Sequence, residues 1–351
     1  MRLGVDLRCV TEGEPGGIAT YARELLPRLT QEFKSWEILG LITGLKPRKP
    51  DFPFSVKSFH QPNKFINFSL ISFNSPKLDK YLGQADIFFA PTPKYIALSP
   101  KAKLVLTIHD LSFIEHPEYF TFRQRLWHKF LKIKKLLKRA DRIIAVSEHT
   151  AFDIGKFAPE VKSKIRVIYS GVDHVPQAKL ERLKDLPEKY LLAFSPPEPR
   201  KNIGNLLKAY ALIYPKVNLP LVLIGSGKFT EQNGIIKKPF LSDSERWQVL
   251  ANAQALIYPS IYEGFGFPPL EAFKLGVPVL ASQVTSLPEV LGEAAILFDP
   301  WDPKDIARAI EVLVNDENLQ ERLRQLGYNQ AKKYQWALTA QKTAGVIKEL
   351  T

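Results

Sequence analysis

The chain has 351 residues and a net charge of +13, and 45% of its residues are hydrophobic, which excludes an intrinsically disordered chain. Its length suits one to three domains, and its single cysteine, Cys9, excludes a disulfide framework and suits a reducing compartment. The N-terminus is typical of a strand rather than a signal peptide, and no apolar run approaches the roughly 18–20 residues that cross a bilayer. We therefore expect a cytoplasmic location.

The positive charge is concentrated in the first half of the chain. Residues 1–178 hold 28 Lys and Arg against 17 Asp and Glu, a balance of +11, whereas residues 179–351 have a balance of +2. The segment 123–139 is the most basic, and Leu126, Phe130, Ile133 and Leu137 recur in it at steps of three and four, which predicts one basic amphipathic helix. Three interpretations stay open: a solvated face over a core stripe, contact with an anionic membrane through 123–142, or nucleic-acid binding. No motif that reads nucleic acid accompanies the charge, so we expect no such partner.

Apolar runs in the first half predict strands that alternate with helices. Strands are expected at 2–7, 36–43, 85–90, 103–109, 141–147 and 164–168, and residues 44–80 are expected to be irregular because they show little periodicity. Gly17 belongs to a glycine pair after the first strand, where the chain either makes a plain tight turn or lets a diphosphate or acceptor group reach a helix N-terminus. His109 ends the fourth strand, and ligands of open α/β sheets lie outside such strand ends, which favours a functional over a purely structural histidine.

A segment without strong pattern, 174–189, is expected to be a linker to a second series of strands and helices. Arg200 and Lys201 precede a helix predicted at 203–213, so two cations lie beside the orphan N–H groups of a helix start. This arrangement favours a diphosphate clamp over two plain surface cations. The strand at 219–224 leads to Gly225-Ser-Gly227, which lacks the third glycine of a dinucleotide fingerprint.

The stretch 255–281 is predicted to form a strand, a glycine loop, a short helix and another strand. Glu263 lies in the loop, Glu271 is expected in the first turn of the helix, and Gly264 and Gly266 lie between them. Carboxylates accept from hydroxyl groups and backbone amides donate to anionic oxygen, so this set suits a polyhydroxylated ligand that carries a phosphate. A tight turn followed by a dipole-stabilising glutamate is the open alternative.

Two successive βα series predict an α/β protein with two Rossmann-like domains that face each other across a cleft. The order of short motifs along nearly the whole chain resembles the GT-B glycosyltransferases of family 4, also called group 1, and among them the mannosyltransferase-like branch. The motifs are Gly16-Gly-Ile-Ala-Thr-Tyr21, Thr107-Ile-His-Asp-Leu-Ser-Phe113, Pro117-Glu118, Asp141-Arg-Ile-Ile-Ala-Val-Ser-Glu148, Gly171-Val-Asp173, Glu198-Pro-Arg-Lys-Asn202, Gly225-Ser-Gly227, the run 259–272, the run 276–282 and Leu287-Pro-Glu-Val290.

The resemblance implies a GT-B fold in which residues 1–178 form the acceptor-side domain, 179–335 the domain that binds a nucleotide sugar, and 336–351 a helix that packs back on the N-terminal domain. It implies a retaining transfer of a hexose, with mannose from GDP-mannose as the best match, to a glycan or lipid-linked acceptor. The alternatives are a UDP- or dTDP-sugar transferase with a soluble sugar acceptor, and a non-catalytic protein that binds sugar nucleotides. With a lipid-linked acceptor, the protein would lie peripherally on the inner face of the cell membrane.

The resemblance also implies roles for particular residues. Glu263 would hold hydroxyls of the donor sugar and Glu271 those of the ribose. Arg200 and Lys201 would neutralise the departing diphosphate, which Gly17 would approach from the other domain. His109 would lie near the reacting centre and position the donor sugar or the acceptor. The donor-binding set is completed by Gly225, Gly264, Phe265, Gly266 and Leu270.

The chain contains no Asp-x-Asp, so we expect no metal and no cofactor besides the nucleotide sugar as co-substrate. No carboxylate is an obvious nucleophile, and the resemblance implies front-face attack, in which the leaving phosphate oxygen takes the acceptor's proton. Many relatives have Gly-Arg-Leu after the strand that here ends at Phe194, where this chain has Ser195-Pro-Pro197. Either Arg200 replaces that missing charge or one contact to the diphosphate is lost. Many relatives also have Asn where this chain has Ser170.

Overall fold

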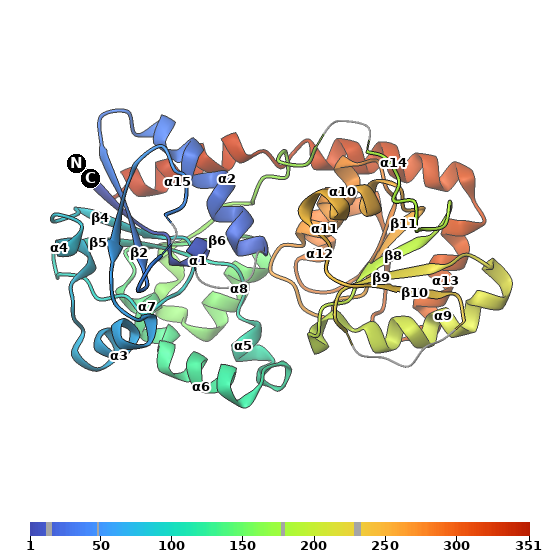
Figure 1. The fold of residues 1–351 in the computed structure, drawn as a ribbon, viewed down its shortest axis with the longest axis horizontal. Coiled ribbons are helices and arrows are strands. Elements are labelled where there is room, and N and C mark those ends of the chain that lie inside the picture. Colours follow the sequence, from blue (N-terminus) through green and yellow to red (C-terminus); the bar gives the residue numbers. More distant parts are fainter. Residues whose placement is uncertain (12–15, 48, 177–179, 228–232) are drawn as a thin grey trace. The chain divides into compact units, whose positions relative to one another are not determined.

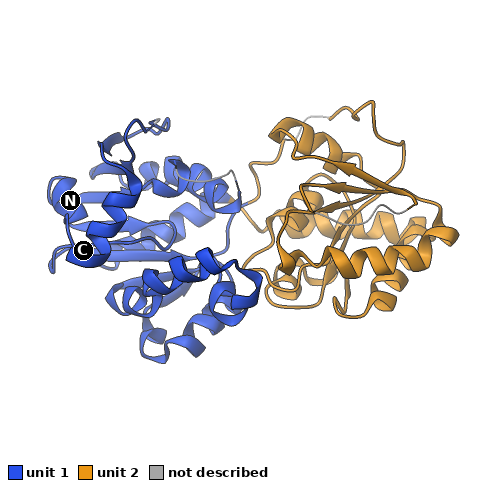
Figure 2. Ribbon diagram, turned by 60° about the horizontal axis from the view of Figure 1, so that its bottom comes forward, with its two compact units in different colours: residues 1–171, 336–351 blue, residues 172–335 orange. Residues whose placement is uncertain are grey.

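The computed structural model describes residues 1–11, 16–47, 49–176, 180–227 and 233–351. The chain divides into two compact units (Figure 2): unit 1 contains Met1–Gly171 and Trp336–Thr351, and unit 2 contains Val172–Gln335. The boundary expected between residues 178 and 179, and residues 177–179 of the expected linker, lie outside the described residues.

Unit 1 is built on a sheet of seven parallel strands in the order β3-β2-β1-β4-β5-β6-β7. The strands are β1 (Arg2–Asp6), β2 (Glu37–Thr43), β3 (Ser55–Phe59), β4 (Ile87–Ala90), β5 (Lys103–Ile108), β6 (Arg142–Ala145) and β7 (Ile165–Val167). The sequence order reverses between β1 and β4, and such a switch point leaves a crevice at the carboxyl ends of the strands. The central strand β4 is buried along its whole length, as helices on both faces of a parallel sheet require.

The helices of unit 1 come from most of its sequence and from the C-terminus (Figure 1). They are α1 (Arg8–Thr11), α2 (Gly17–Glu32), α3 (Asn63–Phe73), α4 (Leu78–Tyr81), α5 (Ser112–Glu115), α6 (Phe122–Leu131), α7 (Ile133–Arg139), α8 (Glu148–Phe157) and α15 (Trp336–Lys348). Among the described residues, no helix combines the length and the apolar character that crossing a membrane requires.

The expectation of an irregular segment over residues 44–80 was wrong, because β3, α3 and α4 form there. The sequence of this segment lacks a regular apolar pattern for two reasons. The edge strand β3 carries polar residues and is only partly buried, so it has no continuous apolar run. Helix α3 leaves Phe65, Phe68 and Phe73 exposed, so its apolar residues do not keep to one face.

The single basic helix expected over residues 123–139 is also corrected. Lys132 adopts the left-handed conformation, with φ at 48°, and separates α6 from α7. The predicted stripe therefore divides into two parts. Ile133 and Leu137 on α7 are buried, whereas Leu126 and Phe130 on α6 are 42% and 48% exposed. The apolar side chains of α6 are thus not simply a core stripe.

Unit 2 contains six parallel strands in the order β10-β9-β8-β11-β12-β13. The strands are β8 (Leu191–Phe194), β9 (Leu221–Ile224), β10 (Ile235–Lys238), β11 (Ala255–Tyr258), β12 (Val279–Ser282) and β13 (Ala295–Phe298). The helices are α9 (Ile203–Val217), α10 (Asp243–Ala251), α11 (Phe267–Lys274), α12 (Leu287–Leu291), α13 (Pro303–Val314) and α14 (Glu317–Ala331). The predicted strand, glycine loop, helix and strand over 255–281 are confirmed as β11, α11 and β12, and the sheet order reverses between β8 and β11.

The C-terminal helix α15 belongs to unit 1 and packs against α2. Trp336, its first residue, is fully buried, and its ring lies 5.9 Å from the ring of Tyr21 on α2. Thr339 adds a polar contact, because its hydroxyl donates to the Tyr169 carbonyl over 2.8 Å. Chain segments more than 300 residues apart therefore share one core.

Candidate active site

The carboxyl ends of β8 and β11 meet at the switch point of unit 2, and the two charged motifs follow these two strands. Arg200 and Lys201 lie in the 3₁₀ turn Pro199–Lys201, directly before α9. Glu263 lies in the loop after β11. Its Oε1 atom is 2.6 Å from Lys201 Nζ and 3.0 Å from Arg200 Nη1. The structure thus joins the predicted sugar-side carboxylate directly to the predicted diphosphate clamp.

Glu263 is held from several directions. The hydroxyl of Tyr258, at the end of β11, donates to Glu263 Oε1 over 2.8 Å and accepts from Lys201 Nζ over 3.0 Å. The backbone N–H of Glu263 donates to the Thr285 hydroxyl, and its carbonyl accepts from the Ser286 hydroxyl. Only 8% of the residue is exposed. A buried carboxylate with fixed partners has a defined orientation toward a ligand.

The ionisable groups of this cluster change one another's pKa values. Burial alone would raise the pKa of Glu263, but the neighbouring Lys201 and Arg200 outweigh it and lower that pKa to about 2. Burial lowers the pKa of Lys201, because the attraction of Glu263 only partly offsets the loss of water. Burial and the Glu263 charge raise the pKa of the Tyr258 hydroxyl well above its usual range. Glu263 is therefore ionised at pH 7 and Tyr258 is a neutral donor.

Arg200 has further partners. Its Nη2 atom lies 2.7 Å from a carboxylate oxygen of Glu198, and its Nη1 donates to the Tyr262 carbonyl over 3.2 Å. The cations Arg200 and Lys201 are thus balanced by two carboxylates, those of Glu198 and Glu263. An incoming anion must compete with these internal contacts.

Glu271 is only 3% exposed and lies in the second turn of α11, one turn later than expected, because the helix already begins at Phe267. Arg246 of α10 forms an ion pair with Glu271 Oε2, and His174 Nε2 lies 3.4 Å from Oε1. Burial would raise the pKa of Glu271, but the Arg246 charge and the His174 hydrogen bond lower it. The Arg246 guanidinium also lies over the ring of Trp247, 4.5 Å from its centroid.

The glycine loop between the two carboxylates requires glycine at its last position. Gly266 caps α11 with φ at 95°, and a Cβ there would meet the Leu287 side chain at 2.8 Å. The preceding Phe265 is 5% exposed, so its ring is part of the core. Leu270 is fully buried, and its N–H lies in the position that makes the first hydrogen bond of α11, to the carbonyl of the N-cap residue Gly266. Gly264 lies in the same loop, before Phe265.

Close packing requires a glycine at position 225. Its φ is 135°, and a Cβ there would lie 2.4 Å from the Ser195 carbonyl oxygen. The nearby N–H of Gly227 donates to the same oxygen over 2.9 Å. The Gly-x-Gly turn after β9 therefore packs against the turn after β8, at Ser195.

The remaining predicted site residues belong to unit 1. His109 follows β5, and its Nε2 lies 2.8 Å from the carbonyl oxygen of Pro91, which follows β4. A carbonyl only accepts, so Nε2 carries the proton and Nδ1 of the neutral ring is an acceptor. Burial lowers the pKa of His109 although the contacts with Pro91 and Asp110 oppose it, which keeps the ring neutral at pH 7. Gly17 is the first residue of α2 and is exposed.

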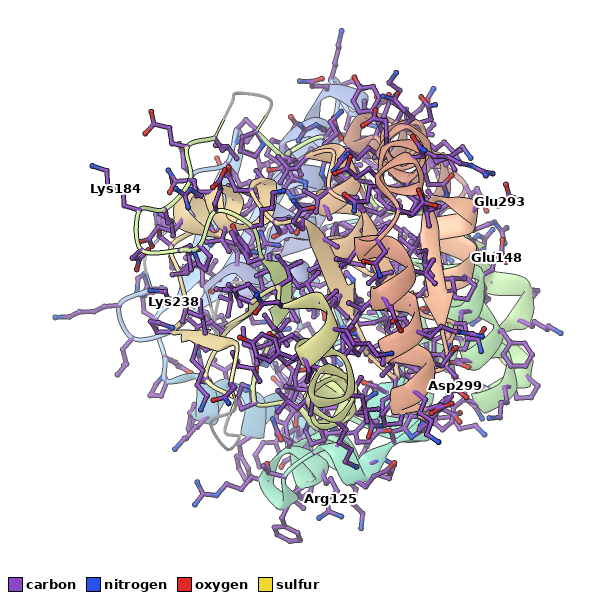
Figure 3. The ribbon with its side chains drawn as sticks, turned by 90° about the vertical axis from the view of Figure 1, so that its right-hand side faces the viewer. Arg125, Glu148, Lys184, Lys238, Glu293 and Asp299 are labelled. Carbon is purple, nitrogen blue, oxygen red and sulfur yellow. The ribbon has the colours of Figure 1, made fainter. Side chains whose placement is uncertain are left out.

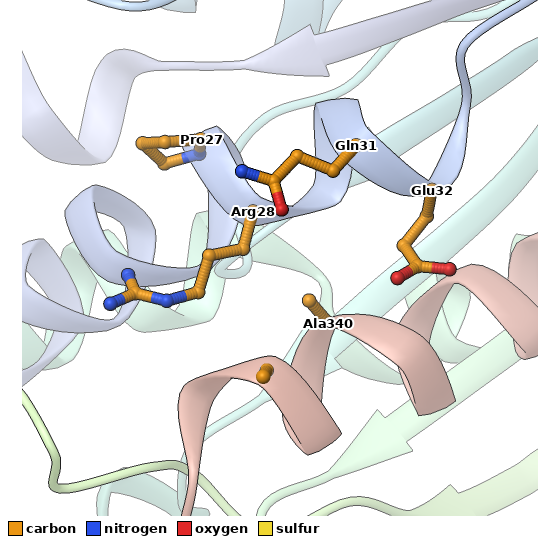
Figure 4. A pocket seen from close by; sticks show the side chains of 6 residues that line it. Pro27, Arg28, Gln31, Glu32 and Ala340 are labelled. Carbon is orange, nitrogen blue, oxygen red and sulfur yellow. The ribbon is translucent and has the colours of Figure 1, made fainter.

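Unit 1 also has a groove between α2 and α15 (Figure 4). It is lined by Pro27, Arg28, Gln31, Glu32, Ala337 and Ala340. No predicted site residue lines it, and Arg28 is already paired with Glu24 at 2.8 Å. Within the described residues, no group of three or more His, Cys, Asp or Glu side chains is arranged to hold a metal ion.

Sequence reasoning missed three residues around the two carboxylates. Tyr258 lies within an apolar strand, Arg246 lies on a helix that carries no recognised motif, and His174 lies in the expected linker. A signal existed only for Tyr258, because the last residue of a strand at a switch point is well placed for a ligand site.

Two family models cover the chain in succession. "Glycosyltransferase Family 4" matches residues 15–175, and "Glycosyl transferases group 1" matches residues 177–330. The O-antigen chain mannosyltransferase B of Escherichia coli is 32% identical over 271 residues, which are 71% of this chain and 71% of that protein. The chain belongs to the group 1, family 4 glycosyltransferases. The predicted family is therefore confirmed.

Other comparisons of this glycosyltransferase agree with that assignment. The serotype-specific mannosyltransferase WbdA of Escherichia coli is 30% identical over 267 residues, which are 68% of this chain. The chain spans only about a third of WbdA's length, because the match covers 32% of that protein. Among solved structures, sucrose-phosphate synthase from Thermosynechococcus elongatus has a TM-score of 0.73 at 18% identity, over 99% of this chain and 98% of that one. This likeness confirms the predicted GT-B fold of two Rossmann-like units.

Proposed function

We propose that this glycosyltransferase moves mannose from GDP-mannose to a glycan or lipid-linked acceptor with retention of the anomeric configuration. The observation that carries the proposal is the cluster of Lys201, Arg200 and Glu263 at the switch point of unit 2. It puts two cations, suited to a diphosphate, against a carboxylate suited to sugar hydroxyls. The choice of mannose is supported by the names of the relatives from Escherichia coli, which are mannosyltransferases.

In the proposed reaction the bond between C1 of the sugar and the phosphate oxygen breaks, and an acceptor oxygen forms a bond to C1 on the same face. The departing phosphate oxygen takes the acceptor's proton. Negative charge develops on the diphosphate, and Arg200 and Lys201 stabilise it without an added metal ion. Glu263 accepts hydrogen bonds from the sugar hydroxyls, and the amides of Gly264, Phe265 and Gly266 contribute backbone donors.

The nucleoside part of the donor is assigned to Glu271. Among the described residues, each of its oxygens has one protein donor, which leaves lone pairs for the two hydroxyls of a ribose. Gly17 and His109 in unit 1 are assigned to the diphosphate and to the reacting sugar. The neutral His109 ring offers Nδ1 as an acceptor for a sugar hydroxyl.

For the acceptor, we propose a lipid-linked molecule reached at an anionic membrane surface. Helix α6 supports this, because it exposes Phe122, Leu126, Trp127 and Phe130 beside basic residues. Arg125 projects into solvent from this helix (Figure 3). Aromatic and aliphatic side chains that insert at the headgroup boundary, together with cations that attract anionic lipid, are the two features of a peripheral membrane contact.

A thermal-shift panel of GDP-mannose, UDP-, dTDP- and ADP-sugars tests the donor. GDP-mannose at 100 times its dissociation constant is expected to stabilise the protein by roughly 2.7 kcal/mol. A larger increase in the melting temperature with a UDP- or dTDP-sugar would identify that sugar nucleotide as the donor in place of GDP-mannose. No increase with any of these ligands would refute the proposal. Release of GDP with a lipid-linked acceptor distinguishes a transferase from a protein that only binds, and NMR of the product reads its anomeric configuration.

A further inference from the structure

The chain enters and leaves unit 2 through two neighbouring segments. It enters at Val172 and leaves after Gln335. The N–H of Val172 donates to the Tyr334 carbonyl over 3.0 Å, so the entering and leaving segments are bonded to each other. The Tyr334 hydroxyl in turn donates to the Val290 carbonyl over 3.0 Å, and its ring lies 5.7 Å from that of Phe265 in the glycine loop. The entering segment is therefore anchored to the body of unit 2.

His174 lies two residues after the entry point, and its side chain is only 9% exposed. Its Nε2 is 3.4 Å from Glu271 Oε1. Its ring lies edge-on to Trp247 and Phe267, with centroids 6.0 Å and 6.2 Å away. These two aromatic rings limit the directions in which the imidazole can turn, so the nitrogen is held toward the carboxylate.

The two donors to Glu271 act on different oxygens. Arg246 binds Oε2 from a partly exposed position, with 26% of its side chain accessible, and His174 binds Oε1 from the interior. A carboxylate with one donor on each oxygen has a fixed plane, whereas one held only by Arg246 is able to rotate about that contact. Because an ionised carboxylate only accepts, His174 must carry its proton on Nε2.

We propose that His174 is a positioning residue for nucleotide recognition: it holds Glu271 in the orientation in which both carboxylate oxygens meet the hydroxyls of the ribose. The inference rests on the proposed function, because it requires Glu271 to bind the ribose. It gives the segment 172–176 a role in donor selection beyond joining the two units.

Two substitutions with the same functional group separate this role from plain packing. In His174→Gln the side-chain amide nitrogen takes about the place of Nε2, whereas in His174→Asn it takes about the place of Nδ1, away from Glu271. Calorimetry with GDP and with 2′,3′-dideoxy-GDP gives the preference for the ribose as a ratio of dissociation constants. A change in overall stability alone does not alter this ratio.

The wild-type protein and His174→Gln are expected to prefer GDP, and His174→Asn is expected to lose about three- to tenfold of that preference, the value of one hydrogen bond. Glu271→Ala is expected to show almost no preference. His149→Asn is a matched control, because His149 pairs with Asp153 of the same helix through Nε2 at 3.2 Å, and it should keep the wild-type ratio.

An unchanged ratio in His174→Asn, with a clear preference in the wild type, would overturn the positioning role and leave the proposed function standing. A wild-type protein that binds GDP and the dideoxy form equally would overturn the role of Glu271 and the inference with it. A loss of preference that is equal in the Gln and Asn variants would assign His174 to packing only.

Discussion

Lys201 Nζ lies 2.6 Å from Glu263 Oε1, so the cation assigned to the diphosphate is neutralised by the carboxylate assigned to the sugar. Arg200 makes a second contact with the same oxygen, at 3.0 Å. Because only 13% of the Lys201 side chain and 10% of the Glu263 side chain are exposed, the pair interacts more strongly than a surface ion pair would. A donor that binds here has to replace this contact, with its diphosphate taking the cations and its hydroxyls taking the carboxylate.

Replacing Glu263 by Gln is therefore expected to separate binding from turnover. The variant keeps the size of the side chain but leaves Arg200 and Lys201 without this balancing charge, so GDP should bind at least as tightly as in the wild type. Turnover should fall by 10-fold or more, because a charged hydrogen bond to the sugar is worth on the order of 2 kcal/mol. Calorimetry and initial rates measure the two effects.

The control is Glu311→Gln, which removes the partner of Lys216 in an exposed pair at 3.2 Å and should change neither quantity. Loss of GDP affinity together with an unchanged turnover in Glu263→Gln would reverse the assignment of the two carboxylates.

Acid should destabilise the wild type more than Glu263→Gln. The pKa of Glu263 is about 2 in the folded protein, below its ordinary value of 4.5. The ionised Glu263 carboxylate therefore stabilises the folded protein through Lys201 and Arg200. This contribution to the free energy of unfolding is fully present above about pH 4.5 and is lost as the pH falls toward 2. The difference between the two pKa values corresponds to roughly 3 kcal/mol.

The measurement is the midpoint of thermal unfolding of both proteins between pH 5 and pH 2. The gap between the two midpoints should narrow as the pH falls, since protonated Glu263 resembles Gln. A constant gap across this range would mean that the charge of Glu263 does not contribute to folding stability.

The main features of the fold and of this cluster were predictable because they depend on local patterns. Short apolar runs between turn residues predicted most strands, and the order of a doubly wound sheet makes β8 and β11 neighbours. The contact between Lys201 and Glu263, 62 residues apart, follows from that order. The contact between His174 and Glu271, 97 residues apart, does not, because His174 lies outside any strand or helix and follows the Gly171-Val-Asp173 motif without being part of it.

Helix α6 shows a different limit of prediction from sequence periodicity. The spacing of Leu126, Phe130, Ile133 and Leu137 fits one helix, and the left-handed residue Lys132 that ends α6 has no glycine signal. Periodicity therefore predicted the helical character but not the break. It also did not predict which apolar residues face solvent, since that depends on how α7 packs into the core.

Trp336→Ala is expected to destabilise unit 1 by about 3–5 kcal/mol, because a fully buried indole is lost next to Tyr21 and a cavity remains. Leu338→Ala on the same helix is the control, as Leu338 is 41% exposed and should cost far less. Urea unfolding of both variants provides the comparison. Equal losses in the two variants would show that α15 contributes little to the core of unit 1.

The proposed contact of α6 with an anionic membrane predicts that binding to vesicles depends on an exposed aromatic side chain of this helix and on salt. Phe122 is 73% exposed, and Phe122→Ser should weaken binding to vesicles that contain anionic lipid by several-fold, because an aromatic side chain no longer inserts at the interface. Added salt should weaken binding of the wild type as well, since the basic residues around α6 are exposed and their attraction to lipid is screened. Co-sedimentation with vesicles of anionic and of neutral lipid measures both effects.

Phe240→Ser is the matched control for this surface, because Phe240 is a 60% exposed phenylalanine in unit 2 that no motif connects with lipid. It should bind vesicles as the wild type does. Binding that is independent of salt and of lipid charge, or equal losses in the two serine variants, would contradict a contact through α6. The acceptor would then be sought among soluble sugars.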